Sequence, residues 1–266
     1  MSTTITHSPV AHETPSSDQH TISAVQRIAN VAKLHLVNRG AVLWLPLFIM
    51  SVIWVSSMLI WWIVSVLIER AGGSPDGEGP VIMGGANSFL VIYMLVVAVQ
   101  AINLTFPFAQ GYSVTRRDFY LGSALTFLGL SLFYAVLMSG LAWLEAATGG
   151  WGLNGYMFGL GMLGIVELAP TFYVYLLALL LFFFVGAAVA AMYVRWRAWG
   201  VVGFFTALGF LVIGLIALAT FTDNWGVVGE WLVANGAVGV ALWSLIVTAA
   251  AGVAGFFILR HATPRA

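Results

Sequence analysis

Six long runs of hydrophobic residues follow one another along the chain. They lie near residues 42–68, 86–109, 119–147, 170–194, 199–221 and 235–259. A helix needs about 20 apolar residues to span a bilayer, whereas a membrane β-strand needs about 10 with alternating polarity. The unbroken runs therefore predict an all-α, polytopic membrane protein with six transmembrane helices, which form one domain over residues 41–260.

The segments outside that domain have different patterns. Residues 1–20 are rich in Ser, Thr, His and Pro and predict a disordered tail, and residues 261–266 form a second, short tail. Residues 21–40 have helical periodicity, which predicts an amphipathic helix lying in the membrane interface. The alternative is a solvated helix that packs on the protein's own loops. The apolar positions on one side of this helix are Ile22, Val25, Ile28, Ala29, Ala32 and Leu36.

One further apolar stretch, residues 153–166, is rich in glycine and too short to cross a bilayer. We interpret it as a re-entrant or interfacial segment on the outer side of the membrane.

The composition agrees with a membrane protein. Hydrophobic residues make up 61% of the chain and charged residues 8%, against about 45–50% and about 25% in soluble domains. A soluble globule of this size has too little interior to bury so much apolar surface.

The positive charges alternate with the predicted spans. Of the ten Lys and Arg residues, only Arg70 falls in a loop on the opposite side from the others. Loops rich in Lys and Arg stay in the cytoplasm, so both termini are predicted to be cytoplasmic in a bacterial plasma membrane. The other nine are Arg27, Lys33, Arg39, Arg116, Arg117, Arg195, Arg197, Arg260 and Arg265.

Several kinds of chemistry lack the residues that they need. The chain has no Cys, its His residues lie outside the hydrophobic runs, and no Asp or Glu lies near the middle of a run. We therefore predict no catalytic residues, no metal site and no cofactor in this chain. Its only lysine, Lys33, has no glycine in the seven residues before it, so the chain lacks an ATP-binding Walker A loop. A formal net charge of zero argues against nucleic-acid binding.

Polar groups inside the runs are few and uncharged. Gln100 and Asn103 lie three residues apart, which places them on one face of the second predicted helix. They are candidates for a substrate path, and hydrogen bonding to a neighbouring helix is the structural alternative.

The stretch 106–123, FPFAQGYSVTRRDFYLGS, contains the most informative pattern. Pro107 and Gly111 are expected to end the second helix. Thr115 is then placed to cap the third helix, with Asp118 three residues later in a capping-box arrangement. The sequence alone is also compatible with an ordinary positively charged cytoplasmic loop.

This pattern resembles the first cytoplasmic loop of ABC-2-type transporter permeases, in particular small bacterial ones. It reads Gly111-Tyr112-Ser113-Val114-Thr115-Arg116-Arg117-Asp118-Phe119-Tyr120-Leu121-Gly122. The resemblance extends to the layout of an amphipathic helix, six spans and two cytoplasmic ends. It implies the membrane subunit of an exporter driven by ATP, with ATP and Mg bound by a separate ATPase subunit. The residues that it implies for coupling to that subunit are Gly111, Ser113, Thr115, Arg116, Arg117, Asp118 and Phe119.

The family layout also implies a second permease, identical or related, because six spans enclose little space. The alternative is a membrane protein that works without an ATPase, such as a secondary carrier or an assembly factor.

Overall fold

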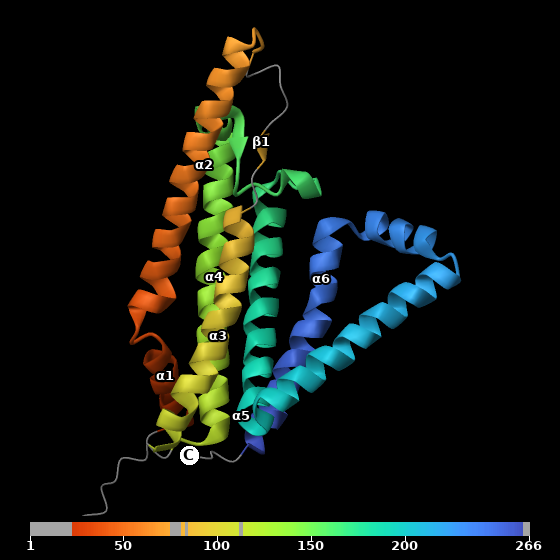
Figure 1. The fold of residues 1–266 in the computed structure, drawn as a ribbon. Helices are drawn as coiled ribbons and strands as arrows, with labels where there is room; N and C mark the ends of the chain where they lie inside the picture. Colours follow the sequence, from red (N-terminus) through yellow and green to blue (C-terminus); the bar gives the residue numbers. More distant parts are fainter. Residues whose placement is uncertain (1–22, 75–80, 83–84, 112–113, 263–266) are drawn as a thin grey trace, which may run out of the picture.

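The hydrophobic runs of the sequence become long helices. The computed structural model describes residues 23–74, 81–82, 85–111 and 114–262 (Figure 1). The tail predicted over residues 1–20 lies outside the described residues. The helices are α1 (Ala24–His35), α2 (Leu45–Arg70), α3 (Gly85–Gly111), α4 (Arg116–Ala147), α5 (Leu168–Phe221) and α6 (Trp225–Arg260). Shorter elements are η1 (Gly40–Trp44), η2 (Gly150–Asn154), η3 (Gly161–Leu163) and the two-residue strands β1 (Val81–Ile82) and β2 (Gly155–Tyr156).

Five of these helices in the described part of the chain are long and apolar enough to cross a membrane. The prediction of six separate spans is therefore not confirmed, because the fourth and fifth runs lie in one element, α5. Its 54 residues are interrupted only at Arg197, where the backbone has φ 60° and ψ −156°. The backbone leaves helical geometry at Arg197, which lies between the fourth and fifth predicted runs, and the chain reverses direction there (Figure 1). A second interruption occurs in α6 at Gly236, with φ 59° and ψ −178°.

The packed core lies between α3, α4 and the first part of α5. Phe127 of α4 stacks on Phe183 of α5 with ring centroids 5.0 Å apart, and both side chains are buried. At Gly186 the two backbones approach closely, since a Cβ there would lie 2.6 Å from the carbonyl oxygen of Leu95 on α3. Small residues permit this kind of close helix crossing in membranes.

The second part of α5 and the first part of α6 diverge from this core (Figure 1). Nearly all side chains of residues 198–235 are exposed or only partly covered; Phe221, for example, is 89% exposed. These apolar surfaces face the bilayer or another protein chain.

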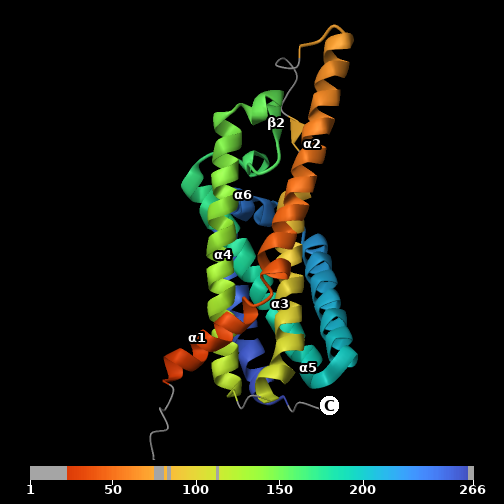
Figure 2. The same cartoon turned by 90° about the vertical axis from the view of Figure 1, so that its left-hand side faces the viewer.

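Helix α1 packs across the beginning of α4 (Figure 2). The contact is tight at Gly122, where a Cβ would lie 2.6 Å from the Cβ of Val31. Val31 and His35 are the buried residues of α1, whereas Val25 and Leu36 of the predicted apolar side are 76% and 37% exposed. Helix α1 therefore rests on a helix of its own protein. The prediction that it lies in the membrane interface stays a prediction.

At the opposite end, residues 150–166 fold into a cap over the end of α4. Strand β2 pairs in parallel with β1, and Gly155 lies against the indole ring of the buried Trp61. The stretch predicted to be re-entrant thus consists of short turns and a strand, which rest on the end of α4 and against the side of α2 (Figure 1).

Candidate functional site

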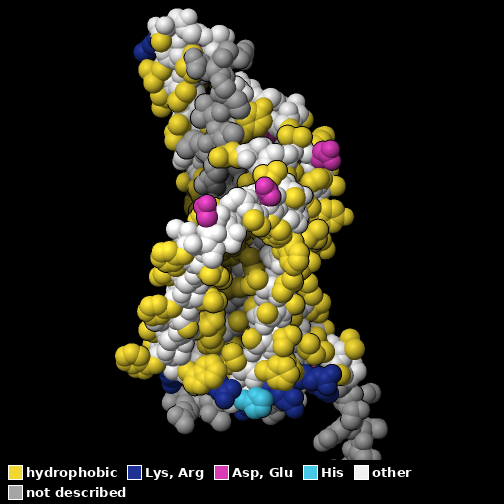
Figure 3. All heavy atoms as spheres, turned by 90° about the vertical axis from the view of Figure 1, so that its right-hand side faces the viewer, with side chains coloured by type: hydrophobic (Ala, Val, Ile, Leu, Met, Phe, Trp, Pro, Cys, Tyr) yellow, Lys and Arg dark blue, Asp and Glu magenta, His cyan; other side chains and the backbone are white. Residues whose placement is uncertain are grey.

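The candidate site is the end of the bundle where α1, α4 and α6 meet. Figure 3 shows that most Lys and Arg side chains on this face gather at the end where α6 finishes, whereas Asp and Glu side chains lie higher. The beginning of α1 and the end of α6 both lie at this basic end (Figure 1). The site is built around the first turns of α4, which contain most of the motif.

Helix α4 begins at the predicted cap. Thr115 is extended, and its Oγ1 accepts a hydrogen bond from the backbone N–H of Asp118 at 3.1 Å. This bond satisfies one of the amides that a helix leaves unpaired at its start. Just upstream, the side-chain amide of Gln110 donates to the carbonyl oxygen of Val114 at 3.1 Å and ties the turn to the end of α3. The cap predicted at Thr115 is confirmed. Helix α3 ends at Gly111 as predicted, but Pro107 lies inside it and does not end it.

The Asp118 carboxylate faces inward and binds α1. Arg27 Nε donates to Asp118 Oδ2 at 2.8 Å, with the Asp118 side chain 7% exposed and that of Arg27 46% exposed. Solvent screens such a half-exposed pair, so we expect it to contribute about 1 kcal/mol or less. Its main effect is to fix the position of α1 on α4.

Aromatic side chains pack next to this ion pair. The buried Phe119 makes edge contacts with Phe106 of α3 at 5.2 Å and with His35 of α1 at 5.6 Å between ring centroids. His35 Nε2 lies 2.7 Å from Ser123 Oγ. Burial lowers the pKa of His35 to about 4, so the ring is neutral at physiological pH.

The two arginines of the motif have different surroundings. Arg116 Nη1 donates to the carbonyl oxygen of Arg260 at 2.8 Å and so joins the start of α4 to the end of α6. A cation is favourable there because carbonyl groups at a helix C-terminus carry partial negative charge. Arg117 points to the exposed surface.

The motif residues differ in exposure. Gly111, Thr115 and Arg117 are exposed at the end of the bundle, Arg116 is partly covered, and Asp118 and Phe119 are buried in contacts within the chain. Ser113 lies outside the described residues. The structure thus brings the motif together around one helix start but leaves only part of it open to a partner.

Three residues of this site were not predicted to take part: Arg27, His35 and Arg260. The sequence predicts Arg27 only as one of the nine positive charges on the cytoplasmic side. Its separation of 91 residues from Asp118 gives no local signal for the pairing. His35 lies at the edge of the predicted apolar side, and the face of α1 that is buried on α4, with Val31 and His35, is turned away from that side.

The candidate substrate-path residues lie elsewhere. Gln100 is exposed on α3, and Asn103 is partly buried with an Oδ1 atom that has no hydrogen-bond partner. The two residues lie on α3 as predicted, and a role in substrate binding stays a prediction.

Glu145 forms a second polar centre, at the far end of α4, which the sequence did not single out. Its fully buried carboxylate accepts hydrogen bonds from the backbone N–H groups of Met157, Phe158 and Gly159 at 2.8–3.1 Å, and from Trp151 Nε1 at 3.1 Å. One side chain thereby holds the cap of residues 150–166 on the helix end.

Comparisons with protein-family models, curated proteins and solved structures give no match for this chain. The apolar helices and the packing described above define it as an α-helical, multi-pass membrane protein.

Proposed function

We propose that this chain is the membrane-spanning permease subunit of an ATP-driven exporter of the ABC-2 type. ATP and Mg bind a separate ATPase subunit, and the chain itself catalyses no reaction. The observation that carries the proposal is the basic end of the bundle, where a capped helix start is fixed between three other helices.

A permease of this kind needs a rigid element through which a partner can move the spanning helices. The start of α4 has this property, because Arg27, Phe106 and Arg260 connect it to α1, α3 and α6, respectively. A displacement of this helix start by the partner would therefore move α1, α3 and α6 together with α4. Tightly packed helices move as units because their interfaces change between distinct arrangements rather than deforming gradually.

The exposed part of the motif is suited to contact the partner. Arg117 and Thr115 face away from the bundle, and an arginine binds a carboxylate through two parallel hydrogen bonds. We assign Arg117 and Thr115 to contact with the ATPase subunit. Asp118 and Phe119 are positioning residues that hold the helix start.

In this proposal the chain crosses the membrane six times, with α5 counted twice because it reverses at Arg197. The basic end faces the cytoplasm, as the excess of Lys and Arg there favours. A second permease, identical or related, covers part of the exposed apolar surface of residues 198–235.

The test is an affinity purification of the full chain from its host in mild detergent, with and without nucleotide, followed by mass spectrometry. We expect a chain with Walker A and signature motifs in stoichiometric amount. Arg117→Glu should reduce its recovery about tenfold, which corresponds to the loss of one charged contact. Arg39→Glu, an exposed residue before η1, is the matched control and should leave recovery unchanged.

Absence of an ATPase under all these conditions would overturn the proposal and favour a carrier or assembly factor that works alone. Equal recovery with Arg117→Glu and with the control would refute the assignment of the contact residues.

A further inference from the structure

The turn in the middle of α5 exposes two arginines between two apolar helix segments. The hydrophobic runs on its two sides end near residue 194 and begin again near residue 199, so only residues 195–198 lie between them. The chain reverses direction at Arg197 within this short interval (Figure 1). A connection this short stays close to the ends of the apolar segments, so its side chains lie at the depth of the lipid headgroups.

Two tryptophans accompany the arginines of this turn. Trp196 is 47% exposed and Trp199 is 84% exposed. Tryptophan is enriched at the boundary between bilayer and water because its ring is apolar and its N–H is polar. The guanidinium of Arg195 lies over the ring of Trp196, 4.6 Å from the ring centroid, in a cation–π contact. We call these four exposed side chains, Arg195, Trp196, Arg197 and Trp199, the turn patch.

The positive charge of the turn patch is not balanced within the described part of the chain. The ion pair between Arg27 and Asp118 is the only one among the described residues, so no carboxylate there neutralises the arginines of the patch. Figure 3 shows most Lys and Arg side chains of this face in a row at the end where α6 finishes, with no Asp or Glu beside them. The complementary ligand is therefore an anion, and guanidinium groups bind phosphate through paired hydrogen bonds.

The backbone of Arg197 has a conformation that is almost confined to glycine. Its φ of 60° and ψ of −156° strain any residue with a Cβ, and such strain persists where neighbouring contacts or a function maintain it. The chain thus has a charged side chain at the position where glycine would fit the backbone better.

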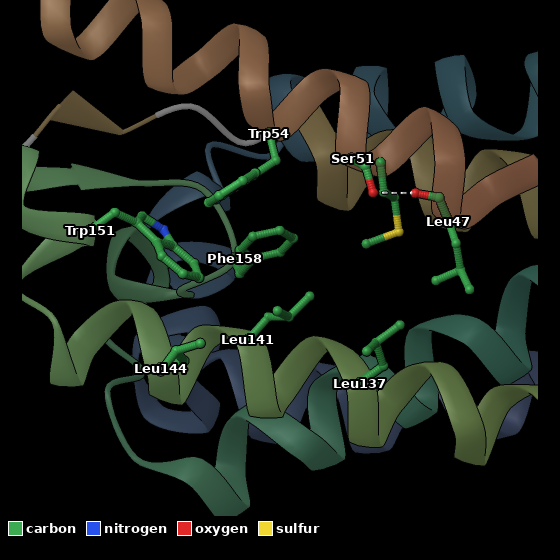
Figure 4. Close-up of a pocket in the computed structure, with 9 residues that line it drawn as sticks. Leu47, Ser51, Trp54, Leu137, Leu141, Leu144, Trp151 and Phe158 are labelled. Carbon is green, nitrogen blue, oxygen red and sulfur yellow. Dashed lines mark hydrogen bonds between the residues drawn. The ribbon is translucent and has the colours of Figure 1, made fainter.

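The groove between α2 and α4 offers an apolar surface without this charge (Figure 4). Its walls consist of leucine, methionine and aromatic side chains together with Ser51, and no Lys or Arg lines it. Nothing in the groove distinguishes one lipid headgroup from another. The turn patch differs because it presents two guanidinium groups at the headgroup depth.

We propose that the turn patch binds the headgroup phosphate of an anionic phospholipid such as phosphatidylglycerol. Arg195 and Arg197 pair with the phosphate, while the exposed rings of the two tryptophans contact the adjoining glycerol and acyl groups. A lipid fits this position better than an acidic protein, because the short turn holds the arginines against the apolar segments. The proposal rests on the double crossing of α5 proposed above, but not on the ATPase subunit.

Photolabelling of the full chain in phosphatidylcholine vesicles tests this site. The vesicles contain a trace of a probe lipid, either phosphatidylglycerol or phosphatidylcholine, with a diazirine in the same acyl chain. Each Lys or Arg near an anionic surface raises binding about fivefold, so the phosphatidylglycerol probe should label peptides that contain residues 196–205 roughly tenfold more than the phosphatidylcholine probe. Both probes should label peptides that contain residues 137–144, beside the uncharged groove, to the same extent.

Single substitutions separate a defined site from general attraction by positive charge. Arg195→Gln and Arg197→Gln each remove one guanidinium and leave one arginine in the turn, so the charge that orients the turn is retained. Each should lower the preference for phosphatidylglycerol about fivefold. Lys33→Gln removes an equal charge from an exposed position on α1 and is the matched control, which should leave the preference unchanged.

Three labelling results would overturn the proposal. They are equal labelling of residues 196–205 by both probes, a loss of preference with Lys33→Gln as large as with Arg197→Gln, and a loss of preference when inorganic phosphate replaces sodium chloride at equal ionic strength. The last result would show a site for a free anion instead of a lipid.

The affinity purification described above distinguishes a lipid from a protein partner. With Arg197→Gln we expect unchanged recovery of the ATPase subunit and a reduced lipid preference. Reduced recovery with an unchanged lipid preference would assign the turn patch to a protein contact and overturn the proposal. Absence of any ATPase would refute the proposed function, whereas a labelling preference that depends on Arg197 would still establish the lipid site.

Discussion

The Glu145 carboxylate should control whether the cap of residues 150–166 stays on the bundle. It accepts four hydrogen bonds, three of them from consecutive backbone N–H groups, and the side chain is completely buried. Glu145→Gln keeps the size of the side chain but replaces one acceptor oxygen by an NH2 group. The amide then either loses the bond from Gly159, whose N–H meets Oε1, or loses the three bonds to Oε2.

The loss of stability of the cap is estimated from the smaller loss, in which only the bond from Gly159 is removed. A hydrogen bond to a charged group contributes about 1.5–3 kcal/mol and one to a neutral group about 0.5–1.5 kcal/mol. Losing one bond costs about 2 kcal/mol, and weakening three others by about 1 kcal/mol each brings the total to about 5 kcal/mol. The free energy for local opening of residues 155–160 should fall by this amount, which accelerates amide exchange there by roughly several thousandfold.

Hydrogen exchange measured by mass spectrometry on the chain in nanodiscs gives this quantity directly, peptide by peptide. Glu167→Gln is the matched control, because Glu167 lies near the same end, is exposed and caps no backbone amide of α5. Exchange in peptides of α3 reports that the rest of the bundle is intact. If Glu145→Gln exchanges no faster than the control, the carboxylate does not hold the cap.

Three further predictions concern other parts of the chain. The pKa of His35 is lowered from 6.5 to about 4, so docking of α1 should be complete above pH 6.5 and weaken by up to about 1.4 kcal/mol per pH unit as the pH falls toward 4. Amide hydrogen exchange in α1, corrected for the intrinsic pH dependence of exchange, should accelerate over that range, and His35→Phe should remove the dependence. Arg197→Gly should raise the free energy of unfolding by about 1 kcal/mol, because φ 60° with ψ −156° is a conformation that strains a non-glycine residue. Gly236→Ala should lower the free energy of unfolding by a similar amount, because Gly236 has nearly the same conformation. Equal melting temperatures for the two variants would contradict this account. Gly122→Leu should detach α1 and expose it to trypsin at neutral pH, whereas Gly129→Leu, where a Cβ meets nothing within 4 Å, should not.

The sequence predicted well the features that depend on local pattern. The first three hydrophobic runs correspond to α2, α3 and α4, and the cap at Thr115 lies where the motif placed it. Hydropathy and capping depend on neighbouring residues, so they can be read from one sequence. The fourth and fifth runs lie in one element, α5, but its break at Arg197 falls in the gap that the sequence leaves between them, residues 195–198.

The pairings between distant segments could not be predicted from local pattern. Asp118 was correctly assigned to the start of α4, but its partner Arg27 is fixed by the way α1 crosses that helix. Glu145 is two residues from the end of α4, and only the folded cap brings three backbone N–H groups to its carboxylate. These contacts depend on tertiary packing.

The contact between α1 and α4 also imposes an order on biosynthesis. Arg27 leaves the ribosome 91 residues before Asp118, which takes about 5–20 seconds at usual translation rates. During that interval Val31 and the rest of the α1 face that later packs on α4 have no protein to cover them. The nascent helix must wait on the membrane surface or on the insertion machinery until the helix that receives it has been inserted.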